Sequence, residues 1–293
     1  KMRSPSGAWS TAIDVDTDHA GADLDAVIAN GTQLHLAYTH TRSGINRLGY
    51  RVWSGSSWSD ETTLADIQPL LEHNISIDDY SDGTTGIAHY DIGVGGVQYT
   101  QVLGGGVGVI RETVASAGGG TGAFPCAAID RFDEPHVVFY DDSVSPAQLS
   151  YASPPASAEP IFDAPLQTSC AATNNGTPCV AIVDYATQEV WYGCRDSTGD
   201  WPLEAVTGDG FYALTPALVH DHRNAPHIVF YDYLTGALWY ARRSGLGIVW
   251  ELGMIDDDGD VGYMPDIAVD ADRQLHVTYQ DRGRSQLKYA VGR

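Results

Sequence analysis

The sequence has few basic residues and no long apolar run. Its 16 lysine and arginine residues stand against 38 aspartate and glutamate residues, and the formal net charge is −22. Such a surface repels a nucleic-acid backbone and an anionic membrane. No apolar segment approaches the ~20 residues that cross a bilayer. These absences exclude nucleic acid as a partner and predict no membrane insertion.

Cysteine is also scarce, since the chain has only four. They form no Cys-x-x-Cys pair and their spacing fits no common zinc module, which disfavours a metal-thiolate site. An even number of cysteines in a lysine-poor chain instead predicts disulfides and an oxidising compartment. The first residues, KMRSPSGAW, lack the apolar core of a signal peptide. We therefore expect the mature form of a secreted or periplasmic protein.

Glycine and tyrosine, by contrast, are abundant. The 32 glycines, 16 tyrosines and 7 tryptophans in 293 residues favour short strands joined by tight turns over helices. An aliphatic-x-Tyr triplet recurs at intervals of roughly 41 to 52 residues. It ends, in the six copies, at Tyr50, Tyr99, Tyr151, Tyr192, Tyr240 and Tyr289.

Each repeat contains about four strand-like runs, here termed a, b, c and d, separated by turn signals. Four-stranded units at this period predict a single all-β domain, a six-bladed β-propeller over residues 1–293. The last copy lacks a d strand, and residues 8–16 (AWSTAIDVD) match the missing strand and are expected to close the ring. The expected blades span about 22–64, 73–115, 124–164, 168–207, 214–255 and 264–293.

Three copies show the repeat clearly. They read PHVVFYDDSVSPAQLSYA from Pro135, PHIVFYDYLTGALWYARR from Pro226 and LHVTYQDRGRSQLKYA from Leu275. The pattern Asp-x-x-Gly-x-Pro-His-(aliphatic)-x-Tyr-x-Asp, followed by Leu-x-Tyr-Ala, resembles bacterial secreted six-bladed propellers that are loosely grouped as sialidase-like. The resemblance covers nearly the whole chain and implies a fold, not an activity. The Asp-box of true sialidases, Ser-x-Asp-x-Gly-x-x-Trp, is missing from every blade, which counts against that enzyme.

Two residues that look catalytic recur in most blades and are therefore interpreted as structural. A b-strand histidine is expected to make a hydrogen bond within its own blade, for example to the a–b turn. An aspartate at the start of the b–c loop is expected to accept backbone N–H groups of that loop, although a ring of such carboxylates around the channel could also hold a cation. The positions are His35, His136, His227 and His276, and Asp91, Asp141, Asp184, Asp232 and Asp281.

Residues that break the repeat are better functional candidates. The d–a and b–c loops of a propeller emerge on one face, and blades 1 and 6 are neighbours once the ring closes. Arginines of two b–c loops can clamp an anion there, with histidines as acid or base. Alternatively, the arginines only neutralise nearby acidic loops. The anion-binding candidates are Arg42, Arg47, Arg282 and Arg284, and the catalytic candidates are His40, His73 and His19.

Two acidic d–a loops, DVDTDHAGADLD and DDDGD, are rich in oxygen ligands. Such clusters suit Ca²⁺, although they also occur as solvated turns. The candidate ligands are Asp14, Asp16 and Asp18 in the first loop and Asp256, Asp258 and Asp260 in the second. No organic cofactor is expected.

The pairing of the cysteines stays open at this point. If Asp184 faces Glu189 across the b–c hairpin, Cys179 lies opposite Cys194, and these two residues can form a cross-strand disulfide. Cys126 and Cys170 would then lie on inner strands of adjacent blades and pair across them. Alternatively, the a–b turn sets Cys170 opposite Cys179.

The sequence thus favours a monomeric, carbohydrate-directed propeller. Its ligand would be a glycan or a small anion, bound without turnover or cleaved by lyase or hydrolase chemistry on an acidic sugar. The alternative is a non-catalytic propeller, stabilised by calcium, that binds a protein.

Overall fold

The computed structural model describes residues 14–15, 21–29, 31–67, 75–91, 94–104, 106–116, 121–163, 165–173, 175–184, 186–243 and 249–292. Within these ranges every regular element is a β-strand. No helix that is long and apolar enough to span a membrane is present in the described part of the chain.

The strands form six antiparallel sheets, each a meander in chain order. Blade 1 contains β1 (Gly21–Ala29), β2 (Gln33–Arg42), β3 (Ile45–Trp53) and β4 (Thr62–Asp66). Blade 2 contains β5 (Ile75–Asp79), β6 (Thr85–Asp91), β7 (Gly96–Leu103) and β8 (Gly108–Ser116). Blade 3 contains β9 (Thr121–Ile129), β10 (Pro135–Asp141), β11 (Gln148–Ala152) and β12 (Glu159–Asp163).

The second half of the chain repeats this plan. Blade 4 contains β13 (Pro165–Ala172), β14 (Pro178–Asp184), β15 (Val190–Cys194) and β16 (Leu203–Ala205). Blade 5 contains β17 (Ala213–His220), β18 (Pro226–Asp232), β19 (Ala237–Arg243) and β20 (Trp250–Asp256). Blade 6 contains β21 (Val261–Val269), β22 (Leu275–Asp281) and β23 (Gln286–Gly292).

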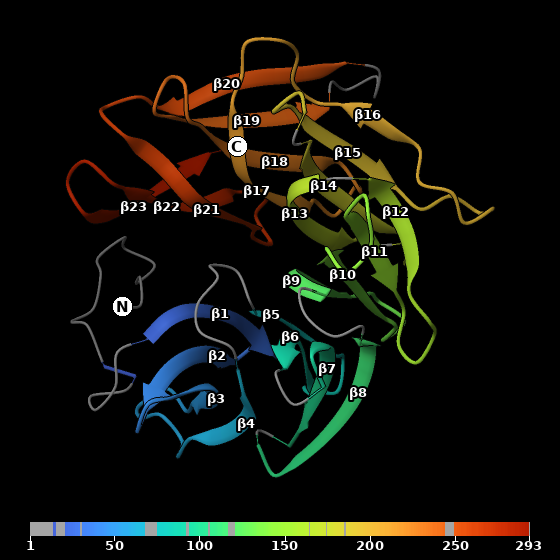
Figure 1. Cartoon of the computed structure of the whole chain (residues 1–293). Helices are drawn as coiled ribbons and strands as arrows, with labels where there is room; N and C mark the ends of the chain where they lie inside the picture. Colours follow the sequence, from blue (N-terminus) through green and yellow to red (C-terminus); the bar gives the residue numbers. More distant parts are fainter. Residues whose placement is uncertain are drawn as a thin grey trace.

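The six sheets stand around a ring with β1, β5, β9, β13, β17 and β21 innermost (Figure 1). The inner strands pack in sequence, β1 on β5, β5 on β9, β9 on β13, β13 on β17 and β17 on β21. The predicted six-bladed β-propeller is therefore confirmed. Five blades have four strands and blade 6 has three in the described residues. Its predicted fourth strand, 8–16, lies outside them apart from residues 14–15.

The repeated histidine stabilises its own blade, as expected. Its Nδ1 atom shares a hydrogen bond with the hydroxyl of the repeated c-strand tyrosine. This bond adds a side-chain link to the backbone hydrogen bonds between the b and c strands. The pairs are His35 with Tyr50 (2.6 Å), His136 with Tyr151 (2.8 Å), His227 with Tyr240 (2.5 Å), and His276 with Tyr289.

In three of these blades the other ring nitrogen faces the a–b turn. Nε2 of His276 lies 2.9 Å from Oδ2 of Asp270. The equivalent distances are 3.7 Å to Asp130 in blade 3 and 3.9 Å to Asp221 in blade 5. Because each of these aspartates also accepts backbone N–H groups of its turn, the turn, the histidine and the tyrosine form one connected unit.

The repeated aspartate of the b–c loop has the predicted role where its contacts are described. Asp232 Oδ1 accepts the N–H of Tyr212 at 2.9 Å. The equivalent carboxylates accept N–H groups from residues of their own loops. They are Asp141 from Ser143 (2.9 Å), Asp184 from Ala186 (2.9 Å) and Asp281 from Arg284 (2.8 Å).

Side chains also join the inner strands of neighbouring blades. Asp25 Oδ2 on β1 accepts the N–H of Ile77 on β5 at 2.9 Å, and Ser76 Oγ on β5 accepts that of Ala127 on β9 at 3.0 Å. Asp78 Oδ2 accepts the N–H of Ile129 at 2.7 Å. These bonds satisfy backbone groups at blade junctions.

The hydrophobic core lies between blades, and the exposed fraction of one repeated residue shows how well each junction is packed. The aliphatic residue of the aliphatic-x-Tyr triplet packs on the next blade, as Leu238 of blade 5 does on Val261 and Ile267 of blade 6. A Cβ added at Gly262 would lie 2.6 Å from Cβ of Leu238, so this junction needs a glycine. The exposed fraction of the aliphatic side chain is 0% for Leu48, Val97, Leu149, Val190 and Leu238 but 77% for Leu287.

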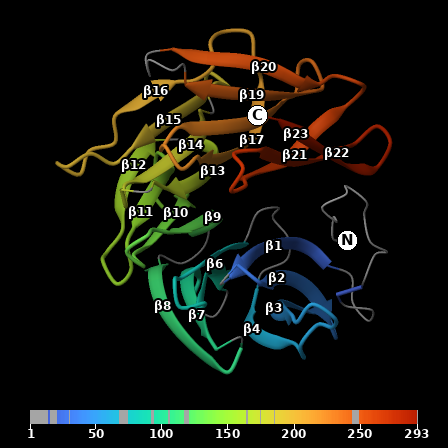
Figure 2. The same cartoon turned by 180° about the vertical axis from the view of Figure 1, so that it is seen from behind.

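Blade 6 therefore leaves exposed the face that the other blades bury. On the adjacent blade 1, Leu24 and Ile28 of β1 are 67% and 60% exposed. The sheets of blades 6 and 1 are neighbours in the ring (Figure 2). Among the described residues, the junction between blades 6 and 1 is thus the least packed of the six.

Truncating the same repeat position in two blades tests this difference. We expect Leu238→Ala to cost about 2 to 5 kcal/mol, since it creates a cavity. We expect Leu287→Ala to change the free energy of unfolding by no more than about 0.5 kcal/mol. Urea unfolding at equal m values gives both numbers. Equal losses for the two variants would contradict the exposed junction.

The inner-strand carboxylates predict a pH dependence of stability. Burial, with a contribution from Asp266, raises the pKa of Asp25 to about 7, and burial raises the pKa of Asp78 to about 6. Between about pH 4 and pH 7 the folded chain therefore holds a proton on Asp25 that the unfolded chain has released. Its contribution to stability is complete below pH 4 and is lost as the pH rises to 7.

The variant Asp25→Asn removes this titration but keeps an oxygen for the N–H of Ile77. We expect the melting temperature of the variant, relative to the unchanged chain, to rise steadily between pH 4 and pH 7. Differential scanning calorimetry at several pH values measures it. A difference that stays constant across this window would show that Asp25 titrates normally.

Candidate functional site

The predicted anion-binding arginines mostly contact carboxylates of their own neighbourhood. Arg47 Nε lies 3.4 Å from Asp66 Oδ1 on the adjacent strand. Arg284 contacts Asp281 at 2.9 Å and Asp258 at 3.1 Å. Arg282 comes no closer than 4.0 Å to Asp260. Arg42 is exposed at the end of β2. For Arg47 and Arg284, the contacts favour the alternative in which arginines neutralise acidic neighbours.

Among the predicted catalytic histidines, the structure describes only His40. It is 3% exposed on β2, and its Nε2 lies 3.2 Å from Oε1 of Glu61. The other carboxylate oxygen of Glu61 accepts a hydrogen bond from Tyr38 Oη at 2.8 Å. His73 and His19 lie outside the described residues. His40 is therefore part of a buried network, not an exposed loop base.

The electrostatics of this network follow from burial. Burial raises the pKa of Tyr38 to about 12. Burial alone would also raise the pKa of Glu61, but the hydrogen bond from Tyr38 and the nearby His40 together hold it below its usual value. Glu61 thus stays a carboxylate and orients both neighbours.

The three aspartates proposed for calcium in the DDDGD loop each have a cationic partner. Asp256 pairs with Lys288 and accepts a hydrogen bond from Tyr279 Oη at 2.7 Å. Asp258 pairs with Arg284. Asp260 lies 4.0 Å from Arg282 and accepts a hydrogen bond from Tyr231 Oη at 2.6 Å. In the other loop Asp14 is exposed, while Asp16 and Asp18 lie outside the described residues. Calcium at either loop stays a prediction.

A group of tyrosines lies on the loop face of blade 5, close to these residues. The b–c loop of blade 5 contributes Tyr233, which is 57% exposed, and the preceding d–a loop contributes Tyr212, which is 38% exposed. Tyr233 donates its N–H to the carbonyl of Tyr212 at 2.9 Å, and Asp232 holds the N–H of Tyr212. The repeated aspartate therefore fixes the two loops that present these rings.

The ring contacts continue from blade 5 to blade 6. Tyr212 and Tyr233 have centroids 5.5 Å apart, Tyr233 contacts the buried Tyr231 at 6.5 Å, and Tyr231 contacts Tyr263 at 5.7 Å. The guanidinium of Arg282 lies 4.6 Å above the ring of Tyr263. We call Tyr212, Tyr233, Tyr263, Asp260 and Arg282 the tyrosine surface.

This surface combines apolar ring faces with hydrogen-bonding groups at the face where propellers usually bind ligands. Burial and the hydrogen bond to Asp260 raise the pKa of Tyr231 to about 12, so that Tyr231 remains a neutral donor that orients the carboxylate. Arg282 keeps a side-chain exposure of 45%. Such a set can stack on the C–H face of a sugar ring and bond its hydroxyl or carboxyl groups.

Sequence reasoning singled out Arg282 as an anion-binding candidate and Asp260 as a calcium candidate, but it did not single out the tyrosines. Tyr233 directly follows the repeated Tyr-Asp pair, and at that position it is easily taken for part of the shared pattern. The available signal was its place in a turn, where an aromatic side chain has no blade face to pack against.

The structure contains two disulfides, Cys126–Cys170 between blades 3 and 4 and Cys179–Cys194 within blade 4. The expected hairpin register is confirmed, because Cys179 pairs with Cys194 and the N–H of Asp184 donates to the carbonyl of Glu189. The alternative that sets Cys170 opposite Cys179 is wrong, because Cys179 faces Ala171.

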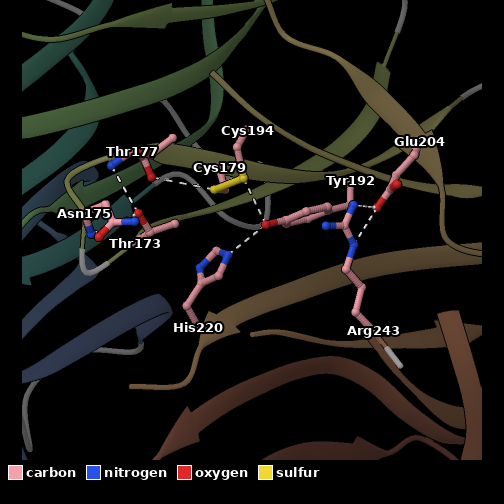
Figure 3. The surroundings of a disulfide bond; sticks show 9 residues. All are labelled: Thr173, Asn175, Thr177, Cys179, Tyr192, Cys194, Glu204, His220 and Arg243. Carbon is pink, nitrogen blue, oxygen red and sulfur yellow. Dashed lines mark hydrogen bonds and ion pairs between the residues drawn. A yellow bond between two sulfur atoms is a disulfide. The ribbon is translucent and has the colours of Figure 1, made fainter. Parts of the chain in front are cut away.

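The blade 4 disulfide adjoins a histidine of blade 5. The hydroxyl of Tyr192 lies 2.9 Å from Sγ of Cys194 and 2.9 Å from Nε2 of His220 (Figure 3). Burial, with His227 nearby, lowers the pKa of His220 to about 4. Arg243, paired with Glu204, lies over the ring of Tyr192 at 5.5 Å.

Comparisons with known proteins support the fold. No protein-family model and no curated protein sequence matches the chain. An α-L-arabinofuranosidase from Fusarium graminearum is 11% identical, covers 96% of each chain and has a TM-score of 0.65. AofleA from Arthrobotrys oligospora is 11% identical over 94% of this chain and 83% of its own, with a TM-score of 0.61.

A third similar structure is the NanB sialidase from Streptococcus pneumoniae. It is 10% identical, with a TM-score of 0.59, over 92% of this chain and 67% of the sialidase. At such low identities the likeness shows the fold alone. The chain thus has the architecture of the sialidase-like six-bladed propellers.

Proposed function

We propose that the protein is a carbohydrate-binding β-propeller and that the tyrosine surface is its glycan site. The observation that carries this proposal is the pair of exposed tyrosine rings, Tyr212 and Tyr233, near an arginine and a carboxylate on the loop face. Exposed aromatic side chains that are fixed by their own loops present contact area at a low entropy cost. A pyranose or furanose ring has an apolar C–H face that matches a phenol ring.

The charges indicate which glycans this surface accepts. Arg282 is the arginine of the tyrosine surface. Its carboxylate contact, at 4.0 Å, is longer than those of Arg47 and Arg284, so it can turn to a ligand at little cost. A short glycan, neutral or with one carboxylate, fits this pattern. The net charge of −22 opposes long polyanionic chains. The propellers with similar folds include an arabinofuranosidase and a sialidase, which supports a carbohydrate ligand.

The proposed location is extracytoplasmic. One disulfide joins blade 3 to blade 4 and a second lies within blade 4, and both are stable in an oxidising compartment. A secreted or periplasmic protein also meets free glycans, in agreement with the proposed ligand.

Removing one exposed ring tests the site. Isothermal titration with arabinobiose, digalacturonic acid and sialyllactose identifies the best ligand of the unchanged chain. We expect Tyr233→Ala to weaken that ligand at least tenfold, since a stacking contact of about 1.4 kcal/mol corresponds to a factor of ten. Tyr233 is 57% exposed, so the melting temperature should hardly change.

Phe132 provides a matched control on the opposite face. It is 60% exposed in the a–b turn of blade 3, and Arg131 lies 4.6 Å above its ring, as Arg282 lies above Tyr263. Phe132→Ala should leave glycan affinity unchanged. If both variants bind equally well, or if no member of the panel binds to the unchanged chain, the proposed site is wrong.

A further inference from the structure

The junction of blades 4 and 5 brings together three departures from the repeat. Cys179 stands where four other blades have the histidine that bonds the c-strand tyrosine. Cys194 follows Tyr192 by two residues, and Cys179 faces it across the hairpin. His220 pairs with Pro226, the residue before the b-strand histidine. The residues that pair with the equivalent position in the other blades are Ile28, Asp79, Ile129, Ala172 and Val269.

These three side chains are close enough to share one ion. One ligand atom from each of Cys179, Cys194 and His220 lies within 4.8 Å of the other two. Cys179 is fully buried, while Cys194 and His220 are half-buried. Figure 3 shows that His220 and Cys194 both point toward the Tyr192 hydroxyl.

His220 has unused binding capacity. Its Nε2 bonds only the Tyr192 hydroxyl, and its Nδ1 is buried without a hydrogen-bond partner among the described residues. Leaving a polar atom buried and unpaired is costly. In the other blades the c-strand tyrosine bonds a partner from its own blade, whereas Tyr192 also bonds His220 of the next blade.

We propose that the reduced form of the Cys179–Cys194 pair, together with His220, binds a thiophilic metal ion such as Zn²⁺. Two thiolates and one imidazole are a common zinc ligand set. The Tyr192 hydroxyl then keeps its hydrogen bond to the Cys194 sulfur and orients that ligand from outside the coordination sphere. The fourth coordination position is left to solvent.

The chemistry balances with a dithiol as the reductant. The dithiol transfers two electrons and two protons to the disulfide, becoming a disulfide itself, and leaves two cysteine thiols. Metal binding then displaces the two thiol protons. In a tetrahedral site with Zn–S distances of about 2.3 Å the ligand atoms are about 3.8 Å apart. The sulfurs must therefore separate, and His220 must move inward by about an ångström.

Such a site gives the blade junction a link in either redox state. Oxidised, the disulfide holds β14 to β15. Reduced, the metal holds that hairpin and also connects it to β17 of the next blade. The link is available to a newly made chain before its disulfides form.

Metal binding is tested by titrating Co²⁺, a spectroscopic substitute for Zn²⁺, into the full-length protein. The protein is first reduced with a phosphine, which is then removed without oxygen. We expect one Co²⁺ per chain with a thiolate-to-metal charge-transfer band, and at least tenfold weaker binding by His220→Gln. The oxidised protein should show no such band.

The second disulfide supplies the matched control. Reduced Cys179→Ser/Cys194→Ser retains two thiols at Cys126 and Cys170 but should give no thiolate band. Reduced Cys126→Ser/Cys170→Ser should bind like the unchanged chain. Equal binding by His220→Gln, or by the variant without Cys179 and Cys194, would overturn the proposal. So would loss of the near-UV circular dichroism signal of the reduced chain with Zn²⁺ present, because the site requires a folded junction.

Discussion

The fold depends on burying one face of each blade against the next. The aliphatic residue of the repeated triplet fills that junction, and it is fully buried in five blades. In four blades the tyrosine two residues later bonds the histidine of its own b strand and fixes the hairpin from which the aliphatic side chain projects. A single repeated unit thus stabilises both the blade and the ring. Where it is not buried, at Leu287, the ring is least packed.

The repeat also explains how much of the fold could be predicted from the sequence. A histidine that appears in four blades at one strand position has to serve the blade, and His227 does so by bonding Tyr240. The same reasoning gave the register that sets Cys179 opposite Cys194. Both predictions succeeded because hairpin pairing is local, so that two positions in one repeat determine their contact.

The candidate site was harder to predict because its parts come from four loops of two blades. Pattern matching showed that Arg284 and Asp258 differ from the other repeats but not that they contact each other at 3.1 Å. It also overlooked Tyr233, whose importance follows from exposure and from its contact with Tyr212. The exposure of a loop side chain depends on where the neighbouring loops end, and the periodic pattern of the sequence does not predict where they end. The proposed metal site of blade 4 could not be predicted from one repeat for the same reason, because His220 belongs to the following blade.

The central claim is that a glycan lies on the tyrosine surface of blades 5 and 6. A crystal structure of the protein soaked with the best ligand of the titration panel tests it most directly. The account predicts a sugar ring stacked on Tyr233 or Tyr212, with a hydroxyl or carboxyl group within hydrogen-bond distance of Arg282 or Asp260. A sugar bound instead beside His40 in blade 1, or on the face of the a–b turns, would contradict it.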